Sequence, residues 1–188
     1  MRWDSLFEDL EAQLWAEDRL NFESEISERA RVEDAAVGLS DRLRASTGQL
    51  IGVGLLSGAV IEGTLAHAGA EALLINDGRH QVLVPYTAAT RYEGLGRGAQ
   101  GEPSAARRNL GMAGSLRALA RDRAELAISL LRYDSQPVVH GVVDRVGRDY
   151  FDLAIVPPGE ARRHGNVSRV WTVPFASLAA IRSLRDPG

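Results

Sequence analysis

The sequence predicts a mainly β chain with a helical N-terminus, in which two five-stranded repeats follow one another, each preceded by a short helix. The first observation is an internal repeat, because residues 55–75 return in diverged form at residues 133–155. The second is a matching exit, VPYTAATRYEGL from Val84 and VPFASLAAIRSL from Val173, with a spacing of 89 residues. The third is a regular series of turn residues between short apolar runs, which is typical of an all-β chain.

The composition fits a globular protein and excludes several kinds of site. The 188 residues are 45% hydrophobic and include no cysteine, which rules out disulfides and thiolate metal sites. No apolar run reaches 18 residues, so no insertion into a membrane is expected. The acidic start has no basic region followed by an apolar centre, as a signal peptide would. These observations predict a cytoplasmic location.

Residues 1–35 are predicted to form an acidic, amphipathic helical arm. Residues 1–34 carry eleven acidic residues and four arginines, whereas the rest of the chain has an excess of four arginines over acidic residues. Helical spacing places four apolar residues on one stripe of the arm, which is the predicted interaction helix: Trp3, Phe7, Leu10 and Leu14. The charges favour a solvated helix face, and the stripe must pack on the body or on a second subunit.

Residues 36–95 form the first predicted repeat. A short helix over about 38–46 is followed by five strands, at 49–56, 60–66, 71–76, 81–84 and 90–93. Asp77-Gly78 between two apolar runs is the strongest hairpin signal in the chain. Pro85 lacks an amide donor and is therefore expected to end a strand or to lie at its edge.

Residues 96–111 are predicted to be a Gly-rich linker. The glycines of the preceding GLGRG run have the wrong spacing for a nucleotide-binding loop. The second repeat, residues 112–184, has a helix over about 115–123 and strands at 126–132, 138–145, 150–156, 167–173 and 179–183. A spacing of 76 residues aligns Leu119 with Leu43 and Leu126 with Leu50. Residues 185–188 are a short tail.

A helix followed by five short strands, with a glycine in the middle of the second strand, resembles the Sm-like fold. That resemblance implies two strongly bent five-stranded barrels, with Gly63 and Gly141 as structural hinges where the sheet curls. It also implies which side chains fill the barrels: Leu65, Leu73, Ile75, Val82 and Val84 in the first, and Val143, Phe151, Leu153, Trp171 and Val173 in the second.

The chain also resembles a group of uncharacterised actinobacterial proteins with an MRW-type start and an LRALARDRA-type segment. Some members of that group are labelled transcriptional regulators. No helix-turn-helix pattern is present here to support that role. The resemblance therefore indicates a lineage and no mechanism.

RNA-binding Sm proteins typically place Asp and Asn in the loop after the second strand and Arg-Gly before the last strand. Here Glu71 and Asp149 stand near the acidic position, but no Asn follows at the required place and the Arg-Gly pair is missing. This argues against the usual RNA pocket. Tyr86 and Phe175 could stack on a base, or they could close the ends of the barrels.

No residue pattern supports catalysis, a metal or a cofactor. The four histidines have no partner at metal-ligand spacing: His67, His80, His140 and His164. No serine has the setting of a nucleophile with its base and orienting group. The sequence therefore predicts a protein that is not an enzyme.

The remaining candidates are arginines in loops, which could contact phosphates or simply keep the loops soluble. They are Arg107 and Arg108 in the linker, and Arg162, Arg163, His164 and Arg169 in the long hairpin of the second repeat. Sm-like barrels pair through their edge strands, so we expect a homo-oligomeric scaffold or adaptor that binds a protein partner. The barrels could pair within one chain or between chains. The alternative is an RNA- or DNA-binding module that uses these arginines.

Overall fold

The computed structural model divides the chain into two compact units, Met1–Gly38 and Leu39–Gly188. It describes residues 15, 19, 22, 28, 31, 35–104, 111–131, 138–157 and 167–184. In the first unit the described residues between 15 and 36 are helical, and Trp15 and Phe22 expose more than half of their surface. The predicted stripe of Trp3, Phe7, Leu10 and Leu14 lies outside the described residues.

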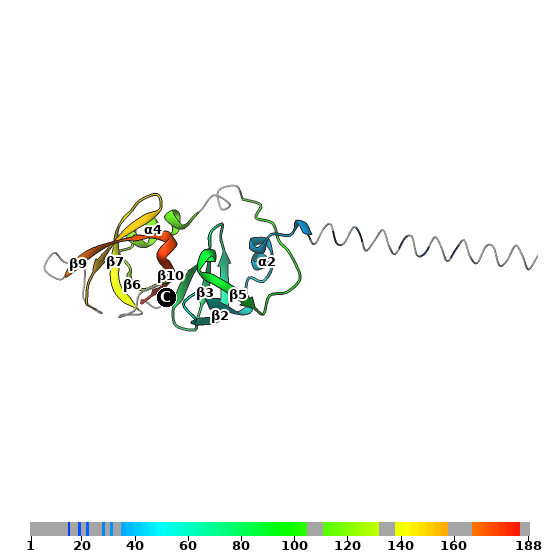
Figure 1. Cartoon of the computed structure of the whole chain (residues 1–188), viewed down its shortest axis with the longest axis horizontal. Helices are drawn as coiled ribbons and strands as arrows, with labels where there is room; N and C mark the ends of the chain where they lie inside the picture. The colour runs from blue at the N-terminus through cyan, green and yellow to red at the C-terminus, as the bar shows by residue number, and fades with distance from the viewer. Residues whose placement is uncertain are drawn as a thin grey trace, which may run out of the picture. The chain divides into compact units, whose positions relative to one another are not determined.

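The second unit contains both repeats. The first has α2 (Leu39–Ala45), β1 (Leu50–Leu55), β2 (Val60–Ala68), β3 (Ala72–Asn76), β4 (Gln81–Pro85), a 3-10 turn η1 (Tyr86–Ala88) and β5 (Ala89–Glu93). The second has α4 (Met112–Arg121), β6 (Glu125–Leu130), β7 (Val139–Val146), β8 (Tyr150–Ile155), β9 (Arg169–Pro174), η2 (Phe175–Ser177) and β10 (Leu178–Ser183). The prediction of a mainly β chain with a short helix before each repeat is confirmed (Figure 1).

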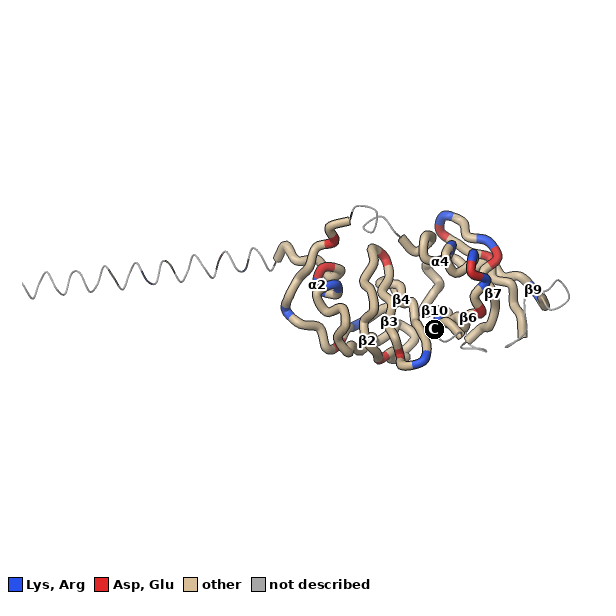
Figure 2. The backbone as a smooth tube through the Cα atoms, turned by 180° about the vertical axis from the view of Figure 1, so that it is seen from behind, with Lys and Arg blue, Asp and Glu red and all other residues tan. Residues whose placement is uncertain are grey.

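The ten strands form one antiparallel sheet in the order β5-β1-β2-β3-β4-β10-β6-β7-β8-β9. Figure 2 shows the middle of this order, with β2, β3 and β4 followed by β10, β6 and β7. The sheet is open among the described residues, so the two closed barrels expected from the sequence are not seen. In the first repeat β10, and not β5, pairs with the edge of β4, and in the second repeat β9 pairs with β8 alone among the described strands.

Gly63 and Gly141 occupy equivalent places in β2 and β7. A Cβ atom at Gly63 would overlap the carbonyl oxygen of Asn76, and one at Gly141 would overlap that of Ala154. Each glycine therefore allows a neighbouring strand to approach more closely than a side chain would permit. In both strands the pairing shifts register two to four residues further on, as it does at a β-bulge. Their role as hinges stays a prediction.

The strand pairing corrects one alignment made from the sequence. Gly63 lies opposite Ile51, and Gly141 lies opposite Leu126. Leu126 is therefore the counterpart of Ile51, one residue beyond the predicted Leu50. Adjacent strand residues point to opposite faces, and accordingly Ile51 and Leu126 are buried while Leu50 is exposed. The loop from helix to strand is one residue shorter in the second repeat, which sequence similarity between two leucines had concealed.

The predicted interior is confirmed almost completely. Nine of the ten apolar residues assigned to the two barrels are at most 3% exposed, and Trp171 is half-buried against the second core. However, the two hydrophobic cores share residues across the middle of the sheet. Ala179 and Ala180 of β10 belong to the core of the first repeat. Ala72 of β3 belongs to the core of the second, and Leu83 of β4 packs against it.

Candidate functional site

The residues predicted for nucleic-acid binding are not brought together by the described structure. Arg107, Arg108, Arg162, Arg163 and His164 lie outside the described residues. Arg169 begins β9 and is exposed.

The two aromatic candidates lie in the 3-10 turns that follow β4 and β9. The hydroxyl of Tyr86 donates a hydrogen bond of 2.8 Å to the carbonyl oxygen of Gly69, and its ring packs against the first core. The ring of Phe175 lies 6.4 Å from that of Phe151 and packs against the second core. Both rings therefore pack against the cores, and whether they stack on a base or close the ends of barrels stays a prediction.

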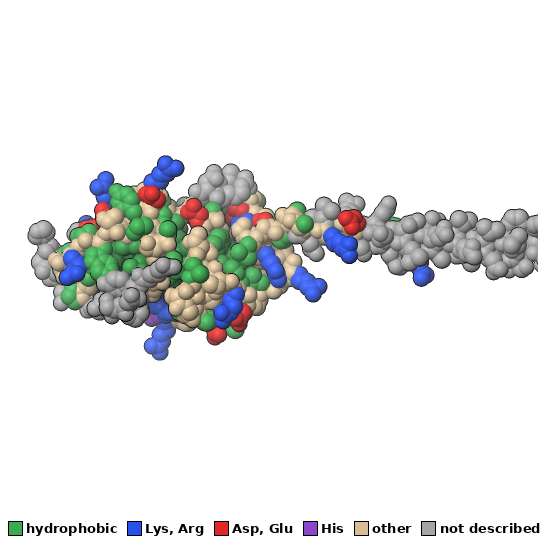
Figure 3. All heavy atoms as spheres, viewed as in Figure 1, with side chains coloured by type: hydrophobic (Ala, Val, Ile, Leu, Met, Phe, Trp, Pro, Cys, Tyr) green, Lys and Arg blue, Asp and Glu red, His purple; other side chains and the backbone are tan. Residues whose placement is uncertain are grey.

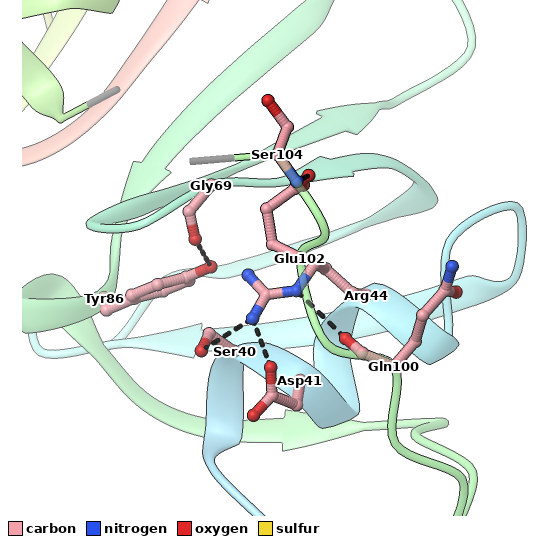
Figure 4. A network of polar contacts seen from close by, with 8 residues as sticks. All are labelled: Ser40, Asp41, Arg44, Gly69, Tyr86, Gln100, Glu102 and Ser104. Atoms are coloured by element: carbon pink, nitrogen blue, oxygen red, sulfur yellow. Dashed lines mark hydrogen bonds and ion pairs between the residues drawn. The ribbon is translucent and has the colours of Figure 1, made fainter. Parts of the chain in front are cut away.

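Arg44 in α2 is the centre of a polar network beside Tyr86 (Figure 4). Its guanidinium contacts Asp41 and donates to the Ser40 hydroxyl at 3.3 Å and to the Gln100 carbonyl oxygen at 3.1 Å. The amide of Gln100 donates in return to the Asp41 carbonyl oxygen at 2.9 Å. These bonds hold the start of the predicted linker on α2. The network offers no nucleophile beside a base, and its contacts are those of a structural clamp.

Burial raises the pKa of the Tyr86 phenol well above its usual value. The nearby Tyr92 raises that pKa further, whereas the guanidinium of Arg44 lowers it. Burial also raises the pKa of Tyr92, whose hydroxyl oxygen is buried without a hydrogen-bond partner. Both phenols therefore stay protonated at neutral pH, and neither is prepared to act as a base.

Among the described residues, no group of three His, Asp, Glu or Cys side chains could hold a metal ion. His67 lies on β2, His140 on β7 and His80 in the β3–β4 turn. His164 is outside the described residues. None of the described helices is long and apolar enough to cross a membrane.

The most specific feature is the junction at which the two repeats pair. Leu83 of β4 lies opposite Ile181 of β10, and Val82 lies opposite Arg182. The guanidinium of Arg182 forms an ion pair with Asp77 in the β3–β4 turn, and the Asp77 side chain is only 14% exposed. Backbone pairing, shared cores and an ion pair thus join the last strand of one repeat to the fourth strand of the other.

The two outer strands of the sheet are again a last strand and a fourth strand of a repeat, and each has a neighbour on one side only among the described residues. β5 is the counterpart of β10 and pairs with β1 alone, and β9 is the counterpart of β4 and pairs with β8 alone, within the described part of the chain. Val170 on β9 is more than half exposed. In Figure 3, hydrophobic side chains reach the surface over the half of the sheet that contains β9. An edge of this kind presents amides and carbonyls to which another strand can bind.

A groove of about 560 Å³ runs beside β9. Its walls are Leu130 at the end of β6, Leu131 after it, residues 171–174 of β9, and two residues of η2. The corresponding place in the first repeat is not empty, since Ala179, Ala180 and Leu131 of the second repeat pack there against the first core. The groove is therefore the position that a neighbouring repeat would fill.

The sequence contained a signal for this junction that pattern reading missed. Directly before the two aligned exits, the same spacing of 89 residues matches the apolar Leu83 with the polar Thr172. A residue that is apolar in only one copy indicates a surface that is covered in only one copy.

No protein-family model matches the chain, and no curated protein is similar to it.

Proposed function

We propose that the protein is a non-enzymatic scaffold that assembles with copies of itself, β9 of one copy pairing with β5 of the next. In this proposal each half is an Sm-like repeat, and the assembled surface binds a protein partner. The short helix, the five strands and the equivalent glycines Gly63 and Gly141 support the Sm-like assignment.

The observation that carries the proposal is the β4–β10 junction within one chain. There the fourth strand of one repeat already accepts the last strand of another repeat. At the outer edges, β9 is the fourth strand of the second repeat and β5 is the last strand of the first. A second molecule could therefore pair with these edges as β10 pairs with β4. Such a contact is heterologous, and it builds a ring when its rotation closes and a filament when it does not.

The experiment is a measurement of mass against concentration for the full chain, by light scattering or sedimentation. We expect masses above the 20.4 kDa of one chain, rising with concentration. Val170→Asp places a charge on β9 and should shift the chain towards the monomer. Val138→Asp is the matched control, because Val138 is also exposed but lies before β7, inside the sheet.

The arm could also join two copies, and a separate variant distinguishes that route. Phe7→Asp with Leu10→Asp disrupts the predicted stripe of the arm and leaves the sheet unchanged. Assembly through the edges should survive this double substitution. A monomer at every concentration in the unsubstituted chain would contradict self-assembly by either route.

Nucleic acid is the alternative partner, and the same preparations test it. Nucleic acid that copurifies raises the ratio of absorbance at 260 nm to that at 280 nm, and a high-salt wash lowers the ratio again. A low ratio throughout, together with concentration-dependent mass, is the outcome that supports the scaffold.

A further inference from the structure

The charges at the in-chain junction have a definite polarity. The last strand of the second repeat supplies the cation, Arg182, and the β3–β4 turn of the first repeat supplies the anion, Asp77. Asp77 is largely buried, and it also accepts a hydrogen bond of 3.1 Å from the amide of His80. The turn is therefore built to present a carboxylate to β10.

At the outer edges the two strand types carry charges of the opposite sign. The spacing of 89 residues between the two exits places Glu93 of β5 at the position of Arg182. It places Arg169 of β9 at the position of His80, next to the turn. Both side chains are exposed. The outer pair thus has its anion on the last strand and its cation on the fourth, the reverse of the junction.

The register of the junction brings these two outer charges within reach of one another. Arg182 lies opposite Val82 and reaches towards the turn. Glu93 of one copy would accordingly lie opposite Trp171 of the next, with Arg169 two residues along on the same face. Diagonal neighbours of this kind have Cα atoms about 7–8 Å apart, which Glu and Arg side chains span. Arg91 already holds Glu93 at 2.8 Å along β5, so the carboxylate would lie between two guanidinium groups.

An apolar contact supports the same orientation. In the junction Leu131, which follows β6, packs against the first core. Its counterpart is Leu56, since the amides of Leu56 and Leu131 donate to the equivalent carbonyls of Ala88 and Ser177, both at 2.9 Å. Leu56 is 58% exposed, and the groove beside β9 is the position into which it would fit. A β9-to-β9 contact would instead place two grooves and two Arg169 side chains together.

We propose that charge reversal directs the assembly: Glu93 of one copy pairs with Arg169 of the next while Leu56 enters the groove beside β9. The partner of each edge is thereby the other edge of a second copy. This inference rests on the proposed self-assembly and adds its register and the side chains that direct it.

The test is a charge exchange in the full chain, read as the apparent dissociation constant for self-association. Glu93→Arg and Arg169→Glu should each weaken association about three- to tenfold, since each variant turns an attractive exposed pair into a repulsive one. The double variant should recover most of the loss. Arg148→Glu, an exposed arginine on the β7–β8 turn, is the control and should change nothing.

The outcomes separate this inference from the proposed function. Recovery in the double variant supports the directed pair. Association that persists in the unsubstituted chain without recovery in the double variant overturns the pair and leaves self-assembly standing. An unsubstituted chain that stays monomeric overturns both.

Discussion

Replacing Leu56 with serine should weaken self-association by at most about sevenfold. Full burial of a leucine side chain is worth about 2 kcal/mol, and 58% of Leu56 is exposed in the single chain. The contact between copies can bury at most that fraction, or about 1.2 kcal/mol. A difference of about 1.4 kcal/mol is tenfold in an equilibrium constant, which gives the expected loss.

Sedimentation equilibrium of the full chain measures this loss directly. The matched control is Leu39→Ser, because Leu39 is 47% exposed but begins α2 and is part of neither outer strand. The hydrogen bond from the amide of Leu56 to Ala88 belongs to the backbone, so the substitution leaves it in place. Equal association constants for the two variants would refute the argument that Leu56 enters the groove of a neighbouring copy.

Three further predictions concern stability and the alternative partner. Gly63→Ala should lower the free energy of unfolding by about 1–3 kcal/mol in urea denaturation, because its Cβ meets backbone, whereas Gly96→Ala, which meets nothing, should not. Since burial raises the pKa of Tyr86 above its usual 10.0, the folded state keeps a proton that the unfolded state loses above that pH. The free energy of unfolding should therefore be unaffected below about pH 10 and fall as pH rises further, and Tyr86→Phe should reduce the fall seen by circular dichroism. If the arginines of the long hairpin bind nucleic acid, replacing all three should flatten the dependence of affinity on salt by about two to three units. An unchanged slope would exclude that hairpin as the contact.

The parts of the fold that follow from local sequence were predictable. The resemblance of the strand pattern to the Sm-like fold placed Leu73 and Phe151 in the two cores, and both are fully buried. Asp77-Gly78 predicted the β3–β4 hairpin, and Gly78 adopts a φ of +91°, which an L-residue rarely takes. These features depend on neighbours in the chain, so a single sequence contains the information for them.

The junction was not predictable in the same way. Sequence similarity shows that two repeats have the same strands, but strand pairing between repeats depends on surfaces that lie far apart in the chain. Val82 and Arg182, which lie opposite one another, are 100 residues apart in sequence. Treating each copy alone predicted a closed barrel for each, whereas β10 occupies the edge of β4 and β9 remains unpaired with β10.

Positions at which the repeats agree and positions at which they differ have different physical meanings. Gly63 and Gly141 are both glycine because in each repeat the neighbouring strand approaches this position too closely for a side chain. That requirement does not depend on what the repeat binds. By contrast, Arg182 and Glu93 occupy one position with opposite charges, and their partners differ: Arg182 pairs with Asp77 of the other repeat, whereas Glu93 pairs with Arg91 of its own strand. Covering one edge within the chain and leaving the other for a second chain would favour the same difference, because two edges that bind different surfaces need different charges. The differences between the copies are therefore where a function in assembly would be encoded.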